Sequence, residues 1–278
     1  MKVMQIVETC PESAYRRDGG VSYGKVYHEC YYSRSIGCER YFNILLPADY
    51  DETKKYPVLY LLHGIFGDEN VLLNDENNRL VEIFGNMAAD GLAKETILVL
   101  PNIYATSDPE MKPSFSPDSV LPYNDFIKDL VEDLMPYIRE HYSVYTDRQN
   151  QAIAGFSLGG RQTLYIGLQR PDLFGYICAI SPAPGLTPGQ DWAMVHEGQM
   201  QEDEAKFSDD EHLPYVLMIC CCQEDGVVGK FPQTYHEILD RNSVEHTWYE
   251  VPGNDHGPVA VRSGLYNFLR YAFQENEG

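Results

Sequence analysis

The chain has 278 residues, a length that allows one large domain or two small ones, and its 44% hydrophobic and 23% charged residues are typical of globular proteins. Its 42 acidic and 21 basic residues give a net charge of −21. This charge argues against nucleic acid or an anionic membrane as a partner, because both require a positively charged surface. No stretch has the length and apolarity needed to span a bilayer, and the first residues lack the apolar core of a signal peptide. We therefore expect a cytoplasmic protein.

The cysteines favour a reducing compartment. There are seven, an odd number, so they cannot all pair with one another. Cys220, Cys221 and Cys222 are consecutive within an apolar run, where neighbouring side chains of a strand point to opposite faces. We interpret them as small buried side chains rather than disulfide partners or zinc ligands. The sequence contains no metal-binding, dinucleotide-binding or phosphate-loop motif, so we expect no metal and no cofactor.

Short apolar runs alternate with amphipathic segments after an irregular, Tyr-rich region at residues 1–38. This alternation predicts an α/β fold, a mostly parallel sheet with helices on both faces, and we expect one domain over residues 1–278. In such sheets the functional site lies at the carboxyl ends of the strands. The predicted strands are 39–47, 57–64, 96–101, 152–156, 176–181, 215–221 and 246–251, and the predicted helices are 78–91, 124–142, 159–169, 231–242 and 263–274.

A polar, acidic stretch at residues 184–214 interrupts this rhythm. It is longer than most connections, which indicates either a functional lid or a loosely ordered insertion. It follows the predicted strand 176–181, so it is placed to cover a pocket at the carboxyl edge of the sheet. Trp192 and Met194 are its conspicuous bulky apolar residues. Trp192 is predicted either to contact an aromatic part of a substrate or to anchor the insertion to the body.

Residues 155–159, Gly-Phe-Ser-Leu-Gly, fit the pattern G-x-S-x-G. An apolar strand precedes them and a predicted helix follows, which is the strand–turn–helix order of a nucleophile elbow. The two glycines suit this turn because its backbone is strained and the strand and helix pack closely. We therefore predict that Ser157 is the nucleophile of an α/β-hydrolase.

A serine hydroxyl needs a base to take its proton, and that base must be oriented by a third group. In this fold the chain order is Ser, acid, His. Among the histidines after Ser157, His256 lies in a loop directly after a predicted strand and therefore at its carboxyl end. The others lie in the insertion, within a helix or at the start of a strand. We predict that His256 is the base.

The acid is expected at the end of the preceding strand, where Glu224 and Asp225 follow residues 215–222. We favour Asp225, which stands beside a glycine in the turn. Asp255 adjoins His256, but sequence neighbours rarely present their side chains in the required geometry, so we interpret it as a surface residue.

The oxyanion formed on the attacked carbonyl requires preorganised N–H donors. We assign the backbone N–H of Leu158, which follows the nucleophile, and that of Ile65, in the loop after an earlier strand. His63 begins the same loop but precedes Ser157 in the chain, so we interpret it as shaping the loop rather than acting as the base. Phe66 of this loop and Trp192 are the predicted substrate-binding residues.

Three longer stretches resemble the feruloyl esterase branch of the esterase D-like hydrolases. They are YPVLYLLHGIFGDEN, YIREHYSVYTDRQNQAIAGFSLGG and LFGYICAISPAPG, and the resemblance covers residues 41–273. It implies an α/β-hydrolase that cleaves hydroxycinnamoyl or acetyl esters of plant cell-wall saccharides, as in xylan degradation. It places the family's nucleophile at Ser157, its acid at Asp225 and its histidine at His256. Residues 254–258 read Asn-Asp-His-Gly-Pro where family members have Gly-Gly-His-Asp and an aromatic residue, and the insertion 184–214 is longer than in the family.

Three other functions remain open at this stage. They are acyl transfer to a second acceptor, hydrolysis of S-acyl glutathione thioesters, and a catalytically silent binding module. The expected partner is a small-molecule or oligosaccharide ester. The sequence does not identify the acyl group or the alcohol, and it leaves the oligomeric state open, a homo-oligomer included.

Overall fold

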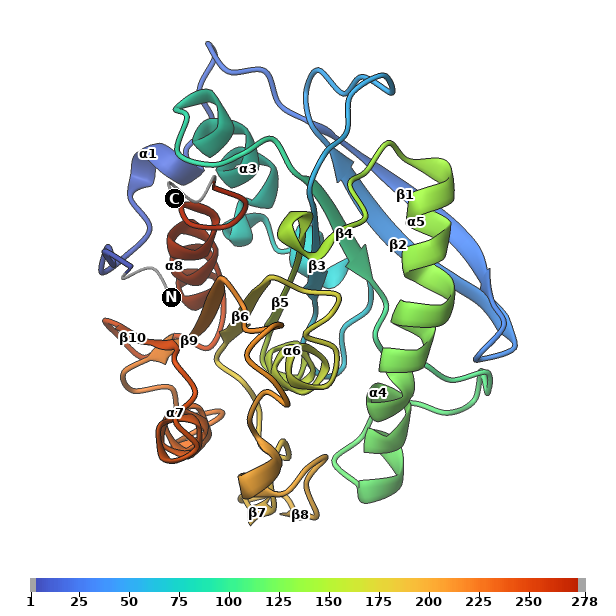
Figure 1. Ribbon diagram of the computed structural model, residues 1–278, viewed down its shortest axis with the longest axis vertical. Helices are drawn as coiled ribbons and strands as arrows, with labels where there is room; N and C mark the ends of the chain where they lie inside the picture. The colour runs from blue at the N-terminus through green and yellow to red at the C-terminus, as the bar shows by residue number, and fades with distance from the viewer. Residues whose placement is uncertain (1–3, 275–278) are drawn as a thin grey trace.

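A computed structural model describes residues 4–274 and shows a central sheet with helices on both sides (Figure 1). The sheet has eight strands in the order β1-β2-β4-β3-β5-β6-β9-β10. In this sheet β2 pairs antiparallel with both β1 and β4, and the pairs from β4 to β10 are parallel. The strands are β1 Lys25–Ser33, β2 Cys38–Leu46, β3 Val58–Leu62, β4 Ile97–Pro101, β5 Gln151–Phe156, β6 Tyr176–Ile180, β9 Val216–Cys222 and β10 Thr247–Val251.

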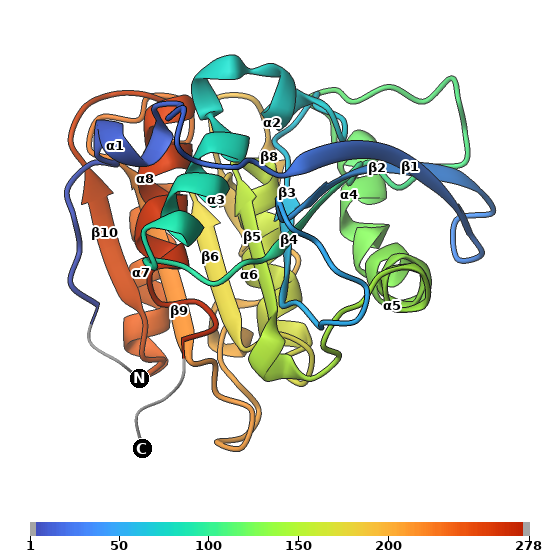
Figure 2. The ribbon, with the colours of Figure 1, turned by 90° about the horizontal axis from the view of Figure 1, so that it is seen from above.

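Two helical layers enclose the sheet, as the view from above shows (Figure 2). One layer is formed by α4 Pro117–Asp129, α5 Met135–His141, α6 Leu158–Gln169 and α7 Phe231–Arg241, and the other by α1 Glu12–Tyr15, α3 Leu80–Ala89 and α8 Pro258–Leu269. The short helix α2 Val71–Asn74 follows β3. A hydrophobic core lies on each side of the sheet. Side chains of successive β3 residues pack alternately into these two cores, because neighbouring side chains of a strand point to opposite faces. This explains why the central strands are continuous apolar runs.

The region 1–38 was predicted to be irregular, and this is wrong for much of it. It contains α1, and β1 pairs along its whole length with β2, from Lys25 opposite Leu46 to Ser33 opposite Cys38. The two strands are joined by a turn in which Gly37 has φ of 87°. The first four residues of β1 are exposed, so this strand lacks the apolar signal of a buried strand.

Two helix boundaries also differ from the prediction. The helix expected at Asn124 begins at Pro117, capped by Ser116, and it runs through a π-helical turn, Leu130–Leu134, into α5. Pro122 lies inside this helix, and a proline at that position normally indicates a helix boundary. The last helix begins at Pro258 and ends at Leu269, earlier than the predicted range 263–274.

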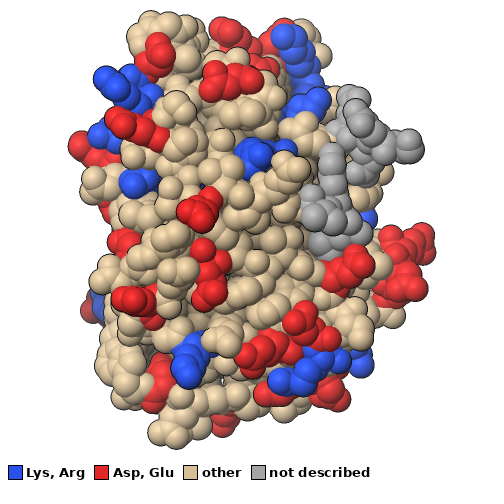
Figure 3. Space-filling model, turned by 90° about the vertical axis from the view of Figure 1, so that its left-hand side faces the viewer, with Lys and Arg blue, Asp and Glu red and all other residues tan. Residues whose placement is uncertain are grey.

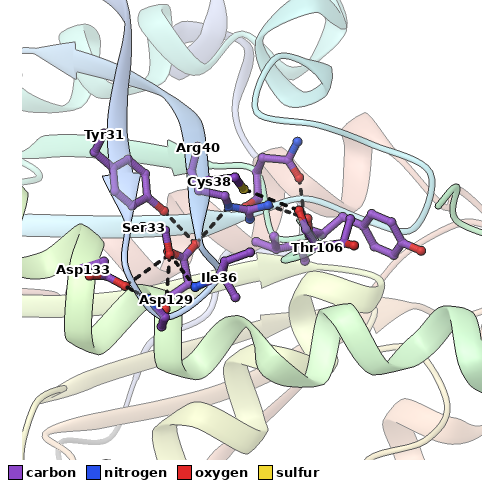
Figure 4. Close-up of polar contacts among 12 residues, drawn as sticks. Tyr31, Ser33, Ile36, Cys38, Arg40, Thr106, Asp129 and Asp133 are labelled. Carbon is purple, nitrogen blue, oxygen red and sulfur yellow. Dashed lines mark hydrogen bonds and ion pairs between the residues drawn. The ribbon is translucent and has the colours of Figure 1, made fainter. Parts of the chain in front are cut away.

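A buried polar network joins the β1–β2 hairpin to α4 (Figure 4). Tyr31 Oη and Arg40 Nε both donate to Asp129 Oδ2, at 2.7 and 3.2 Å, and Asp129 is fully buried. The two remaining guanidinium nitrogens of Arg40 donate to the carbonyls of Asn102 and Tyr104, each at 2.6 Å. Arg40 therefore ties α4 to the loop that follows β4.

The insertion 184–214 contains a small hairpin, β7 Gly189–Gln190 and β8 Val195–His196, and a 3₁₀ turn, Glu202–Glu204. The Asp191 carboxylate holds the hairpin together, because it accepts from the N–H groups of Ala193 and Met194 and contacts His196 Nε2 at 3.0 Å. These contacts outweigh the effect of burial and lower the pKa of Asp191.

Acidic and basic side chains are interspersed on the face of the molecule that carries α1, α7 and α8, and acidic ones predominate over its lower half (Figure 3). Within residues 4–274, no helix combines the length and apolarity needed to cross a membrane. Cys220, Cys221 and Cys222 are buried free thiols on β9, as predicted.

Candidate active site

Three loops at the carboxyl edge of the sheet bring Ser157, Asp225 and His256 together. Ser157 follows β5, Asp225 follows β9, and His256 follows β10. His256 Nε2 lies 3.1 Å from Ser157 Oγ, and His256 Nδ1 lies 2.8 Å from Asp225 Oδ2. An ionised carboxylate only accepts hydrogen bonds, so Nδ1 carries the proton and Nε2 presents a lone pair to the serine hydroxyl. This arrangement can deprotonate Ser157.

The turn at Ser157 has the backbone of a nucleophile elbow. Ser157 has φ of 57° and ψ of −119°, a conformation that is costly for a residue with a side chain. A Cβ on Gly155 would lie 2.2 Å from the carbonyl oxygen of Gly159, and one on Gly159 would lie 2.3 Å from that of Leu62. Both glycines are therefore required by the close approach of strand and helix.

Asp225 is held rigidly in its loop. Its side chain is fully buried, and its Oδ1 accepts from the N–H groups of Val227 and Val228. Burial alone would raise the pKa of Asp225, but the hydrogen bonds from His256 and from the N–H of Val228 outweigh it and lower that pKa. The two other candidate acids form no hydrogen bond with the His256 ring in the described structure: Glu224 is exposed, and Asp255 accepts from the N–H of Val259 at the start of α8.

The loop after β3 lies directly against the nucleophile. A Cβ on Gly64 would lie 3.2 Å from Ser157 Cβ. The N–H of Ile65 donates to no other backbone or side-chain group in the described part of the chain, and Leu158 is the first residue of α6, so its N–H lacks an intrahelical acceptor. The next N–H, that of Phe66, donates to Tyr123 Oη at 3.3 Å. Two unused donors therefore flank Ser157.

His63 shapes this loop. Its Nδ1 donates to the carbonyl of Gly64 at 2.7 Å, and its Nε2 accepts from the N–H of Ile103 at 2.9 Å. Burial lowers the pKa of His63 to about 4, so the ring is neutral. Both ring nitrogens are engaged by backbone groups, which leaves neither free to act on Ser157.

Three exposed aromatic rings form a row that begins at the loop after β3. Phe66 and Phe115 are 5.0 Å apart and Phe115 and Trp192 are 5.3 Å apart between ring centroids, both edge to face. Trp192 has one aromatic neighbour in the described structure, Phe115. The Trp192 side chain is 75% exposed, so most of its surface faces solvent. This exposure is contrary to an anchoring role and compatible with a contact to a ligand.

The model of a family described as putative esterases matches residues 33–223. The chain belongs to this esterase family. A solved structure of a CE1 ferulic acid esterase from Anaeromyces mucronatus, in complex with ferulic acid, is 45% identical, covers 98% of both chains and superposes with a TM-score of 0.92. The α/β-hydrolase fold and the resemblance to feruloyl esterases are thereby confirmed.

Two curated relatives are named as xylanases. An endo-1,4-beta-xylanase/feruloyl esterase from Xylanibacter ruminicola is 30% identical to the esterase over 217 residues, 76% of this chain. Endo-1,4-beta-xylanase Y from Acetivibrio thermocellus is 24% identical over 95% of this chain. The esterase spans 26% of the length of each of these relatives.

Sequence reasoning missed two residues of the esterase's site, Phe115 and Arg161. Phe115 lies in an irregular segment, and no pattern indicates that it meets Trp192. Arg161 is almost fully buried one helical turn after Ser157, and its N–H donates to the carbonyl of Ser157. Its guanidinium donates to Asn124 Oδ1, and Arg161 takes part in none of the ion pairs between described arginines and carboxylates. Burial lowers the pKa of Arg161 to about 10, so it stays charged at neutral pH and adds a positive field beside the site.

Proposed function

We propose that the esterase hydrolyses esters of hydroxycinnamic acids, such as the feruloyl groups attached to plant cell-wall saccharides, with Ser157 as the nucleophile. The observation that carries this proposal is the continuous array from Ser157 Oγ through His256 to Asp225 on a nucleophile elbow. The names of the relatives, a ferulic acid esterase and a xylanase/feruloyl esterase, support the acyl group and the saccharide context.

Acylation begins when Ser157 Oγ attacks the ester carbonyl and His256 Nε2 takes the hydroxyl proton. The imidazolium that forms is stabilised by the Asp225 carboxylate at 2.8 Å. The negative charge on the carbonyl oxygen develops beside the N–H groups of Ile65 and Leu158, which are in place before the reaction and need little reorganisation. His256 then returns the proton to the departing alcohol, and the acyl group remains on Ser157.

Deacylation repeats these steps with water as the nucleophile. His256 Nε2 takes a proton from the water, the hydroxide attacks the acyl carbonyl, and the same two N–H groups hold the second oxyanion. Collapse of this intermediate releases the free acid and returns the proton to Ser157. No step requires a group beyond the residues named.

The aromatic row Phe66–Phe115–Trp192 supports an aromatic acyl or alcohol group over a small acetyl ester. Phe66 follows Ile65 directly, so the row starts beside the assigned oxyanion donors. Exposed aromatic rings contact planar ligands over a large area at low cost in side-chain entropy. An acetyl group alone offers no such surface.

The experiment is a comparison of kcat/KM for methyl ferulate, acetylated xylan, 4-nitrophenyl acetate and S-formylglutathione. We expect methyl ferulate to be preferred over acetylated xylan and over the thioester. Preferred turnover of S-formylglutathione would support the thioesterase alternative, and saturation by a second alcohol acceptor would support acyl transfer. The absence of turnover on all four substrates would contradict the proposal.

A further inference from the structure

Two histidines and an aspartate converge where α7 meets the amino end of β10. His236 and Asp240 are four residues apart on α7, so they share one face of the helix, and His246 directly precedes β10. One potential ligand atom from each of the three lies within 4.8 Å of the other two. Among the described residues, this is the one group of three histidine, cysteine or carboxylate side chains that lie close enough together to hold a metal ion.

The hydrogen bonds fix the orientation of both rings. His246 Nδ1 lies 2.7 Å from the carbonyl oxygen of Val244, which can only accept, so Nδ1 carries the proton and Nε2 presents a lone pair. His236 Nδ1 lies 2.7 Å from that Nε2 and donates to it. A carbonyl that fixes the tautomer of a histidine is the usual outer support of a metal ligand. His236 also stacks on Trp248, with ring centroids 5.2 Å apart and an interplanar angle of 3°.

The third side chain completes a donor set suited to a transition metal. Asp240 Oδ2 lies 3.6 Å from His236 Nε2, the ring nitrogen that does not face His246, and the Asp240 side chain is 62% exposed, so its carboxylate has room to turn toward an ion held between the two rings. Two imidazole nitrogens, one carboxylate oxygen and a water make the tetrahedral set that zinc accepts. The exposure of Asp240 gives an ion and its water access, and the net charge of −21 favours the approach of cations.

We propose that His236, Asp240 and His246 bind one divalent transition metal ion, with zinc as the best match. The ion replaces the hydrogen between the two rings, and the His236 Nδ1 proton moves to Nε2 or to water. Zinc–nitrogen bonds of about 2.05 Å at a tetrahedral angle place the nitrogens about 3.3 Å apart, so the rings separate by about 0.6 Å from their present 2.7 Å.

The site stands at the opposite edge of the sheet from Ser157. His246 lies at the amino end of β10, whereas His256 follows the carboxyl end of this strand. The ion therefore acts as a clamp between α7 and β10 and does not contact the ester. The inference is independent of the proposed function.

The test is calorimetric titration of the chelator-treated full chain with Zn²⁺ alone, together with its melting temperature at rising Zn²⁺. We expect one zinc per chain and a melting temperature that rises with zinc, because the ion binds the folded state. His246→Gln and Asp240→Asn should each weaken binding by at least about tenfold. Asp240 is exposed, so its variant tests the site even if the His246 variant unfolds.

His212→Gln is the matched control. His212 also contacts an aspartate, with Nδ1 3.1 Å from Asp209 Oδ1, but no second histidine completes that pair in the described structure. This variant should bind zinc as the wild type does. Co²⁺ should give the intense visible absorption of a four-coordinate site in the wild type and the control only. Absent binding, binding unchanged in both site variants, or an equal loss in His212→Gln would overturn the proposal.

Discussion

Asp225 Oδ2 lies 2.8 Å from His256 Nδ1, although the two residues are 31 positions apart in the chain. The contact exists because β9 and β10 are adjacent and parallel, so the loops that follow them leave the sheet at the same edge. The carboxylate side chain is fully buried and held by two backbone N–H groups. It therefore fixes both the tautomer and the orientation of the imidazole.

Asp225→Asn should reduce kcat for methyl ferulate by about 10⁴-fold, because an amide can stabilise the wrong tautomer of His256. The measurement is steady-state kinetics, with circular dichroism to establish folding. Asp255→Asn and Glu224→Gln are the controls and should retain most of the activity, since Asp255 accepts from Val259 and Glu224 is exposed. A larger loss in Asp255→Asn than in Asp225→Asn would show that the acid is misassigned.

The rate should depend on pH through His256, which must be neutral to accept the Ser157 proton. The lowered pKa of Asp225 keeps this carboxylate ionised well below neutrality, so it does not limit the rate there. We expect kcat/KM to fall as the pH is lowered from about 8 to about 5, because a protonated imidazole cannot accept the serine proton. Hydrolysis of methyl ferulate across this range is the measurement, and a flat profile would be incompatible with a histidine base.

Trp192→Ala should raise KM for methyl ferulate far more than for 4-nitrophenyl acetate, because Trp192 is 75% exposed and available to a ligand. Its melting temperature should stay close to that of the wild type. Val195→Ala, which is on the same hairpin and 63% exposed, is the matched control. Equal losses on both esters, or a large fall in melting temperature with unchanged kinetics, would favour the anchoring role instead.

Arg40→Met should destabilise the protein by about 3–5 kcal/mol, because it leaves the Asp129 carboxylate buried without its charged partner. Urea unfolding gives the free energy. Arg34→Met is the control: Arg34 Nε lies 3.9 Å from Asp133 Oδ1 and the Arg34 side chain is 87% exposed, so its removal should cost less than about 1 kcal/mol. Similar losses in the two variants would mean that the Arg40 network contributes little.

The candidate triad was predictable because each member follows a strand whose apolar run is visible in the sequence. Ser157 also carries the glycine pattern of the elbow, and His256 is distinguished by its place after β10. β1 was missed because its first half is exposed and because its pairing with β2 cannot be read from the local sequence. The start of α4 was missed because Pro122 stands inside it, and tertiary packing overrides the local preference.

The sequence does not indicate which distant segments of the chain contact one another. Phe115 meets Trp192, and His236 meets His246, only because the chain folds back on itself. Residue type and spacing identify strand ends and helix faces, but they do not fix which loops approach one another.

Labelling by a serine-directed fluorophosphonate, followed by mass spectrometry, tests the role of Ser157 most directly. We predict one label per chain, on the tryptic peptide 149–161, in which Ser157 is the sole serine. Ser157→Ala should take up no label and should lose methyl ferulate hydrolysis by several orders of magnitude, on the order of 10⁶. A label on any other peptide, or a Ser157→Ala variant that retains about a tenth of the activity, would contradict the account.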